Sequence, residues 1–116
     1  MNKNYSSAFF GFLEGMKQMK GKSLSNLEPT EEELLHQLGL AWHKGNSLTV
    51  HDGMILMPNV SIGTAHRRLK ALRKKGFLDL AQDMGDQRVK YIVPTPQAND
   101  YFLALGDCLK TAVRAL

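Results

Sequence analysis

The chain has 116 residues, a net charge of +4 and 43% hydrophobic residues. This length favours a single domain over residues 1–116 with its own core, and the composition argues against a largely disordered chain. The one cysteine excludes an intrachain disulfide and a cysteine-only zinc site. There is no run of about 18 apolar residues and no signal-peptide pattern. We therefore expect a soluble cytoplasmic protein with no membrane partner.

Positive charge is concentrated in one part of the chain. Residues 61–90 contain eight Lys or Arg and three Asp, a net charge of +5, whereas the remaining residues sum to −1. A basic segment on a near-neutral body favours a polyanionic partner. A lysine-rich helix face exposed to water would give the same count, so the charge alone leaves both interpretations open.

The N-terminal part predicts a helix over residues 5–20, followed by a loop over 21–29. Apolar residues recur in the helix at spacings of three and four, which places them on one face: Tyr5, Phe9, Phe12, Met16 and Met19. A second helix is expected to begin at Thr30, with Glu33 completing a capping box. Its apolar face comprises Leu34, Leu35, Leu38 and Trp42, which we assign to the core.

A short helix over residues 50–57 is predicted next, capped by Thr49 and Asp52. Its inward residues are expected to be Val50, Met54, Ile55 and Met57. Ser61 then caps a basic helix over residues 62–75, which Gly76 ends. Strands over 77–81 and 88–93, joined by a turn over 83–87, and a long helix over 96–114 complete the chain.

This order of elements is that of a winged helix-turn-helix. Three stretches resemble the MarR type of winged-helix transcription factors: residues 60–69, the Gly76-Phe77-Leu78 exit into the hairpin, and Asp86-Gln87-Arg88 followed by Val93-Pro94-Thr95. The resemblance covers about residues 30–97. It implies an α+β, mainly helical fold, with a winged helix-turn-helix over 30–94 between dimerisation helices over 5–20 and 95–116. It also implies double-stranded DNA binding in transcription regulation and no enzyme activity.

The faces of the basic helix support that assignment independently. If Ala65, Leu69 and Leu72 point inward, then Gly63, Arg67, Lys70 and Lys74 point outward. We expect helix 61–75 to enter the major groove, with Arg67 paired to guanine, and the wing over 83–88 to lie near the minor groove. The candidate DNA-binding residues are Ser61, Ile62, Gly63, Thr64, His66, Arg67, Arg68, Lys70 and Arg88.

Some of these basic residues have a second interpretation. Arg68 lies at the edge of the buried stripe and can pair internally, and Arg88 can simply brace the hairpin. Arg73, Lys74 and Lys75 also suit the negative end of the helix dipole. Asp86 is expected to orient Arg88 by ion pairing. The alternative function is a winged-helix module that binds protein and not DNA.

The two flanking helices carry more apolar surface than a winged domain can cover, which favours a two-fold dimer. The predicted interface residues are Tyr5, Phe9, Phe12, Leu105, Leu109, Ala112 and Val113. Packing of these two helices on each other within one chain is the alternative. A dimer would separate two recognition helices by about 34 Å and select an inverted repeat.

Motifs for catalysis and cofactors were sought and none was found, including nucleophile elbows, phosphate-binding loops and dinucleotide fingerprints. His36, His43 and Cys108 are residue types that bind metals, but no pair has zinc spacing. Cys108 on an apolar face favours packing over redox sensing. We therefore expect no cofactor and no metal. A small-molecule effector is left open.

Overall fold

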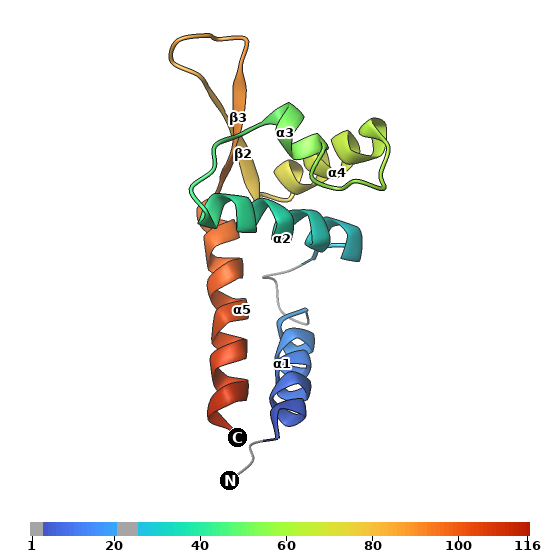
Figure 1. Cartoon of the computed structure of the whole chain (residues 1–116), viewed down its shortest axis with the longest axis vertical. Coiled ribbons are helices and arrows are strands. Elements are labelled where there is room, and N and C mark those ends of the chain that lie inside the picture. The colour runs from blue at the N-terminus through green and yellow to red at the C-terminus, as the bar shows by residue number, and fades with distance from the viewer. Residues whose placement is uncertain (1–3, 21–25) are drawn as a thin grey trace. The chain divides into compact units, whose positions relative to one another are not determined.

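The computed structural model describes residues 4–20 and 26–116, and these fall into two units (Figure 1). Residues 27–98 form one unit, called the winged unit below. The described residues up to Asn26, together with Asn99–Leu116, form the other, called the helical unit. The predicted winged helix-turn-helix spans residues 30–94. Most of the predicted loop over 21–29 lies outside the described residues.

The winged unit contains four helical segments and a small antiparallel sheet. In chain order these are α2 (Pro29–His43), β1 (Leu48–Thr49), α3 (Val50–Met54), α4 (Ile62–Lys74), β2 (Leu78–Gln82), β3 (Lys90–Pro94) and the start of α5 (Pro96–Arg114). The strand order is β1-β3-β2, with Leu48 opposite Ile92 and Leu80 opposite Ile92 on the other side. Figure 1 shows the β2–β3 hairpin ending in a loop that extends beyond the helices of this unit.

The core of the winged unit is built on the apolar face predicted for α2. Leu34, Leu35 and Leu38 are fully buried, and so are Leu72, Phe77 and Ile92 from the other elements. Trp42 is half-buried rather than fully in the core, and its indole N–H donates to the Ile92 carbonyl over 3.1 Å. This bond ties the end of α2 to the central strand, β3.

Two predictions about where helices begin and end are wrong. The N-cap of α2 is Glu28 rather than Thr30, because Pro29 is suited to the first helical position and Glu31, not Glu33, accepts the Glu28 N–H (2.9 Å). Helix α3 ends at Met54, and Ile55 is 57% exposed rather than inward. The last turn tightens, with the Ile55 N–H bonded to the Asp52 carbonyl, and this turns the Ile55 side chain outward.

The Thr49 cap of α3 is confirmed. The Thr49 hydroxyl oxygen accepts the Asp52 N–H (3.1 Å), and the Asp52 carboxylate accepts the Thr49 N–H (3.0 Å). Strand β1 was not predicted, because two residues are too few to show an alternating pattern. It places α3 directly beside the sheet.

In the helical unit, α1 (Tyr5–Lys20) and α5 approach closely at two glycines. A Cβ placed on Gly11 would lie 3.4 Å from the Cβ of Ala112, and one on Gly15 would lie 3.1 Å from the Sγ of Cys108. The two glycines are four residues apart, so they lie on one face of α1. The two flanking helices are thus in contact within one chain, and Cys108 packs there as expected.

Gly53→Ala is expected to destabilise the protein. An added Cβ would overlap Cδ1 of Ile92, which is only 2% exposed and belongs to the central strand. Overpacking of this kind costs about 1–3 kcal/mol of unfolding free energy. Denaturant unfolding measures it, with Gly63→Ala as the matched control in the same unit, because a Cβ at Gly63 meets only Arg67 Nη1 at 3.9 Å. Equal losses in both variants would contradict the packing argument.

Candidate nucleic-acid interface

The two predicted faces of α4 are confirmed. Ala65, Leu69 and Leu72 are buried, at 1%, 6% and 0% exposure. The opposite face is exposed and comprises Gly63, Arg67, Lys70 and Lys74. Among the other candidate residues on this helix and its cap, Ser61, Ile62 and His66 are exposed, whereas Thr64 and Arg68 are half-buried. A narrow buried stripe therefore leaves most of the helix circumference open to a partner.

A chain of hydrogen bonds runs along the first two turns of this exposed surface. Ser61 caps the helix, since its hydroxyl oxygen accepts the Thr64 N–H (3.2 Å), and it also donates to the Thr64 hydroxyl (2.9 Å). Arg67 Nη2 donates to the same Thr64 oxygen (2.9 Å). Because this oxygen accepts from both neighbours, the Thr64 hydroxyl proton is left to donate elsewhere. The chain holds the Arg67 guanidinium on the outward face.

The C-terminal end of α4 is held by contacts that the sequence analysis did not identify. Gly76 has φ +90, a conformation that glycine adopts without strain, as predicted for the residue that ends this helix. The Thr95 hydroxyl donates to the Gly76 carbonyl (2.6 Å), and Gln97 Nε2 donates to the Lys75 carbonyl (3.1 Å). Thr95 also caps α5, because its hydroxyl oxygen accepts the Ala98 N–H (3.1 Å). The Thr95-Pro96 pair, which is typical of a helix start, was the available indication of this cap.

An ion pair joins the end of α4 to the start of α2. Lys75 Nζ lies 2.6 Å from Glu31 Oε1, and Glu31 is 7% exposed. Burial raises the pKa of the Glu31 carboxyl, but hydrogen bonds from Lys75 and the Glu28 N–H outweigh it, so the pKa lies below its ordinary value. Lys75 therefore does more than complement the helix dipole. The Arg73–Asp79 pair, at 3.7 Å and largely exposed, contributes little.

The wing, residues 83–88, is an ordered turn built on two carboxylates. Asp83 Oδ2 accepts the N–H groups of Gly85 (2.9 Å) and Asp86 (2.8 Å). Asp86 accepts Arg88 Nε (3.2 Å) and Nη2 (3.3 Å), which lowers the pKa of Asp86 and confirms that it orients this arginine. The Arg88 side chain is 91% exposed. The wing thus presents one guanidinium, oriented by Asp86, to the surroundings.

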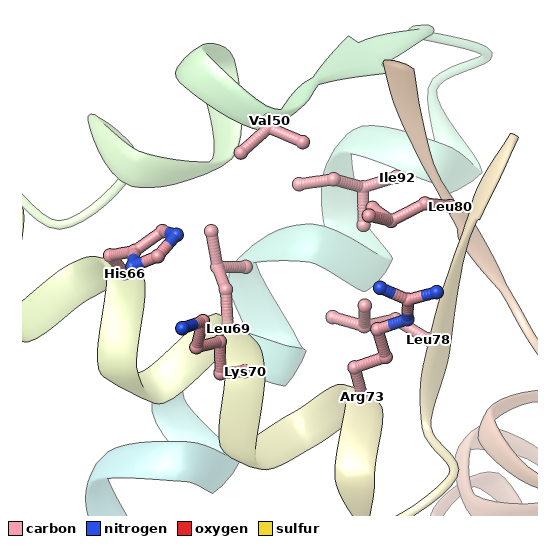
Figure 2. Close-up of a pocket in the computed structure, with 8 residues that line it drawn as sticks. All are labelled: Val50, His66, Leu69, Lys70, Arg73, Leu78, Leu80 and Ile92. Carbon is pink, nitrogen blue, oxygen red and sulfur yellow. The ribbon is translucent and has the colours of Figure 1, made fainter. Parts of the chain in front are cut away.

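A small pocket lies between α4 and the sheet (Figure 2). It has a volume of about 120 Å³, and apolar side chains of Leu69, Leu78, Leu80, Ile92 and Val50 line it. His66, Lys70 and Arg73 contribute basic groups from α4. Figure 2 shows these three spaced along one side of that helix. The pocket has space for a small apolar group beside positive charge.

The described part of the chain shows no metal-binding cluster and no membrane-spanning helix. Within residues 4–20 and 26–116, no three His, Cys, Asp or Glu side chains are grouped so that they could hold a metal ion. Burial lowers the pKa of His36, which favours its neutral form, although Glu32 partly opposes this. None of the helices in the described segments has both the length and the apolar character needed to cross a membrane.

Comparison with known proteins was informative only at the level of structure. No family profile and no curated protein sequence matches the chain. A transcriptional regulator from Thermotoga maritima matches with TM-score 0.67 and 18% identity, over 92% of this chain and 70% of its own. A MepR variant from a multidrug-resistant S. aureus isolate matches with TM-score 0.66 and 22% identity, over 100% and 86%. MarR itself matches with TM-score 0.55 and 18% identity, over 95% and 78%.

The chain has the winged-helix fold of MarR-type regulators. The resemblance deduced from residues 60–69 and the wing, and the mainly helical α+β fold that it implied, are therefore confirmed. In three further matches, the matched part covers 58–64% of the longer known chain. Identities of 17–22% establish a shared fold and do not transfer a ligand or a target.

Glu31→Gln is expected to lower stability by about 1–3 kcal/mol at neutral pH, because it removes the charge that Lys75 pairs with. The folded-state pKa of Glu31 is depressed, so this stabilisation is present above the ordinary glutamate pKa and disappears as the pH falls through the depressed value. Urea unfolding across pH should show the gap to wild type closing in acid. Glu33→Gln, at an exposed neighbour, is the control. Equal stability of Glu31→Gln and wild type at pH 7 would contradict the role of the pair.

Proposed function

We propose that this protein is a homodimeric, sequence-specific double-stranded DNA-binding protein that regulates transcription. In this proposal α4 enters the major groove and the wing lies near the adjacent minor groove. The observation that carries the proposal is the exposed basic face of α4, from Gly63 through Arg67 to Lys74, on a helix whose opposite side is buried. The structural similarity to transcriptional regulators supports it.

The charges on the outward face of α4 are better suited to contact with a duplex than to ion pairing within the chain. Of the basic residues on this helix and its C-cap, Lys75 pairs with the buried Glu31 and Arg73 with the exposed Asp79. Arg67, on the outward face, is held by Thr64, a neutral group, so its charge is not cancelled. Arg67 can therefore donate to a guanine edge, while Lys70 and Lys74 contact phosphates.

The wing supports a minor-groove contact by a single arginine. Asp86 holds Arg88 through Nε and Nη2, which leaves Nη1 directed away from the carboxylate. Narrow A·T-rich minor grooves attract arginine through their negative potential. The Asp86 carboxylate fixes where the guanidinium projects, at the expense of part of its charge.

The dimer is proposed from the apolar surface of the helical unit. Large side chains remain exposed on α1 and α5 of a single chain: Tyr5 (69%), Phe9 (55%), Phe10 (60%), Leu103 (65%), Leu109 (54%) and Val113 (49%). Of the other predicted interface residues, Phe12 and Leu105 are half-buried, and Ala112 is already buried within the chain. Phe10 and Leu103 extend the predicted set. A two-fold partner would cover these side chains and pair two winged units for an inverted-repeat site.

Arg67→Ala is expected to weaken binding to the specific duplex by about 1–3 kcal/mol and to relax sequence preference at one position per half-site. Fluorescence polarisation against a duplex selected from random DNA, and against a scrambled duplex, measures both effects. Lys44→Ala, at an exposed lysine on the C-cap of α2, is the matched control. Equal losses on both duplexes would reduce Arg67 to a phosphate contact.

The same titration in different salt concentrations tests DNA binding itself. With about six phosphate contacts, the association constant should fall about 10³-fold between about 50 and about 200 mM salt. A protein with no affinity for any duplex at low salt would instead be a protein-binding winged helix, and the proposal would be wrong.

Phe9→Glu is expected to yield a folded monomer, because a carboxylate at this position would be buried without a partner in the proposed interface. Sedimentation velocity measures the mass, and affinity for the inverted repeat should fall by about 10²-fold or more as the second half-site contact is lost. Leu40→Glu on α2, at a leucine of similar exposure (49%), is the control that should remain dimeric. A wild-type protein that sediments as a monomer would contradict the dimer.

A further inference from the structure

Gly63 differs from Gly45, Gly53 and Gly76 of the winged unit in having no internal reason to be glycine. A Cβ at Gly53 would overlap Ile92, and Gly45 and Gly76 have positive φ. At Gly63, which lacks positive φ, a Cβ would meet only Arg67 Nη1 at 3.9 Å, an ordinary contact. Glycine is nevertheless a poorer helix former than alanine, by about 1 kcal/mol in a helix interior, and it has no advantage in the first turn. The missing side chain therefore leaves space on the outside of the helix.

Ile62, the residue before it, is an apolar side chain placed where polar ones would be expected. It is the first residue of α4 and is 63% exposed, on a helix whose outward side is otherwise basic. The hydroxyl groups beside it, on Ser61 and Thr64, are bonded to each other. Of the groups that base pairs display in the major groove, the thymine C5-methyl is the one that an aliphatic side chain matches.

We propose that Ile62 packs against a thymine methyl group in the half-site, and that Gly63 lets the helix approach closely enough for this contact. The inference rests on the proposed DNA-binding function and names a specificity-determining residue within it. It predicts a half-site in which Arg67 reads a base edge and Ile62 reads a methyl group. The N-terminal turn of α4 would then discriminate by two different chemistries.

The test uses the whole 116-residue chain and a duplex that the wild type selects from a random-sequence pool. Each thymine is replaced singly by deoxyuridine, which removes only the C5-methyl. Wild type should lose affinity by about four-fold at one position per half-site, the effect of burying one methyl-sized group. Ile62→Ala should show no loss at that position. Ile55→Ala, at an isoleucine of similar exposure (57%) outside α4, should keep the wild-type penalty.

Gly63→Ala provides a second readout in which stability and binding change in opposite directions. Thermal unfolding should show equal or greater stability, because alanine favours the helix and the position is open. Affinity for the selected duplex should fall. Unchanged affinity would overturn the close approach.

The outcomes separate this inference from the function on which it rests. A uracil penalty that persists in Ile62→Ala, or the absence of any such penalty in wild type, overturns the methyl contact while DNA binding stands. Failure to select any duplex overturns DNA binding itself, and the methyl contact with it.

Discussion

Burial of a narrow stripe on α4 determines how much of this helix stays exposed to a partner. Ala65, Leu69 and Leu72 are the residues that hold this helix on the core, and they occupy one narrow face. A wider stripe would stabilise the fold more but would leave less of the helix for a partner. The helix is instead fastened at its C-terminal end by polar contacts, from Glu31 to Lys75 and from Thr95 to Gly76. In its N-terminal half, Ala65 is buried, and the outward side with Gly63 and Arg67 is exposed.

Contacts at the C-terminal end of α4 also balance part of the positive charge there. Lys75 is paired with a buried carboxylate and Arg73 faces Asp79, so the positive charge nearest the sheet is partly balanced within the chain. Towards the N-terminus, Arg67 is bonded to a hydroxyl and keeps its full charge. Arg67 therefore carries a positive charge that its hydrogen bond to the neutral Thr64 hydroxyl does not offset, one turn after the Ser61–Thr64 cap. In a helix-turn-helix the N-terminal part of the recognition helix is the part that contacts base edges. The wing also presents a basic side chain outward, but part of its positive charge is balanced within the chain. Asp86 both orients Arg88 and offsets part of the Arg88 charge.

Most of this arrangement could be predicted from local patterns. The spacing of Ala65, Leu69 and Leu72 predicted both faces of α4, and the Ser61 and Thr49 caps depend on neighbours three residues away. The pairing of Asp86 with Arg88 is equally local. What could not be predicted depends either on residues far apart in the chain or on two local signals that compete at one position. Residues 44 apart in the chain form the Glu31–Lys75 pair, which no local pattern reveals. At the start of α2 two capping arrangements competed, and Pro29 favoured the earlier one.

The roles of the glycines also depend on contacts between residues far apart in the chain, so local sequence patterns could not predict them. In the sequence, Gly53 and Gly63 look alike, since each interrupts a helical pattern beside apolar residues. The fold separates them, because Gly53 faces the Ile92 side chain of the central strand whereas Gly63 faces open space. A glycine needed for packing is constrained from inside, and its replacement should disturb unfolding. A glycine with no close neighbour inside the protein can be constrained only by a partner molecule that approaches from outside. On α4, Gly63 lies on the exposed side with Arg67, so the space beside Ile62 and the charge of Arg67 belong to one surface.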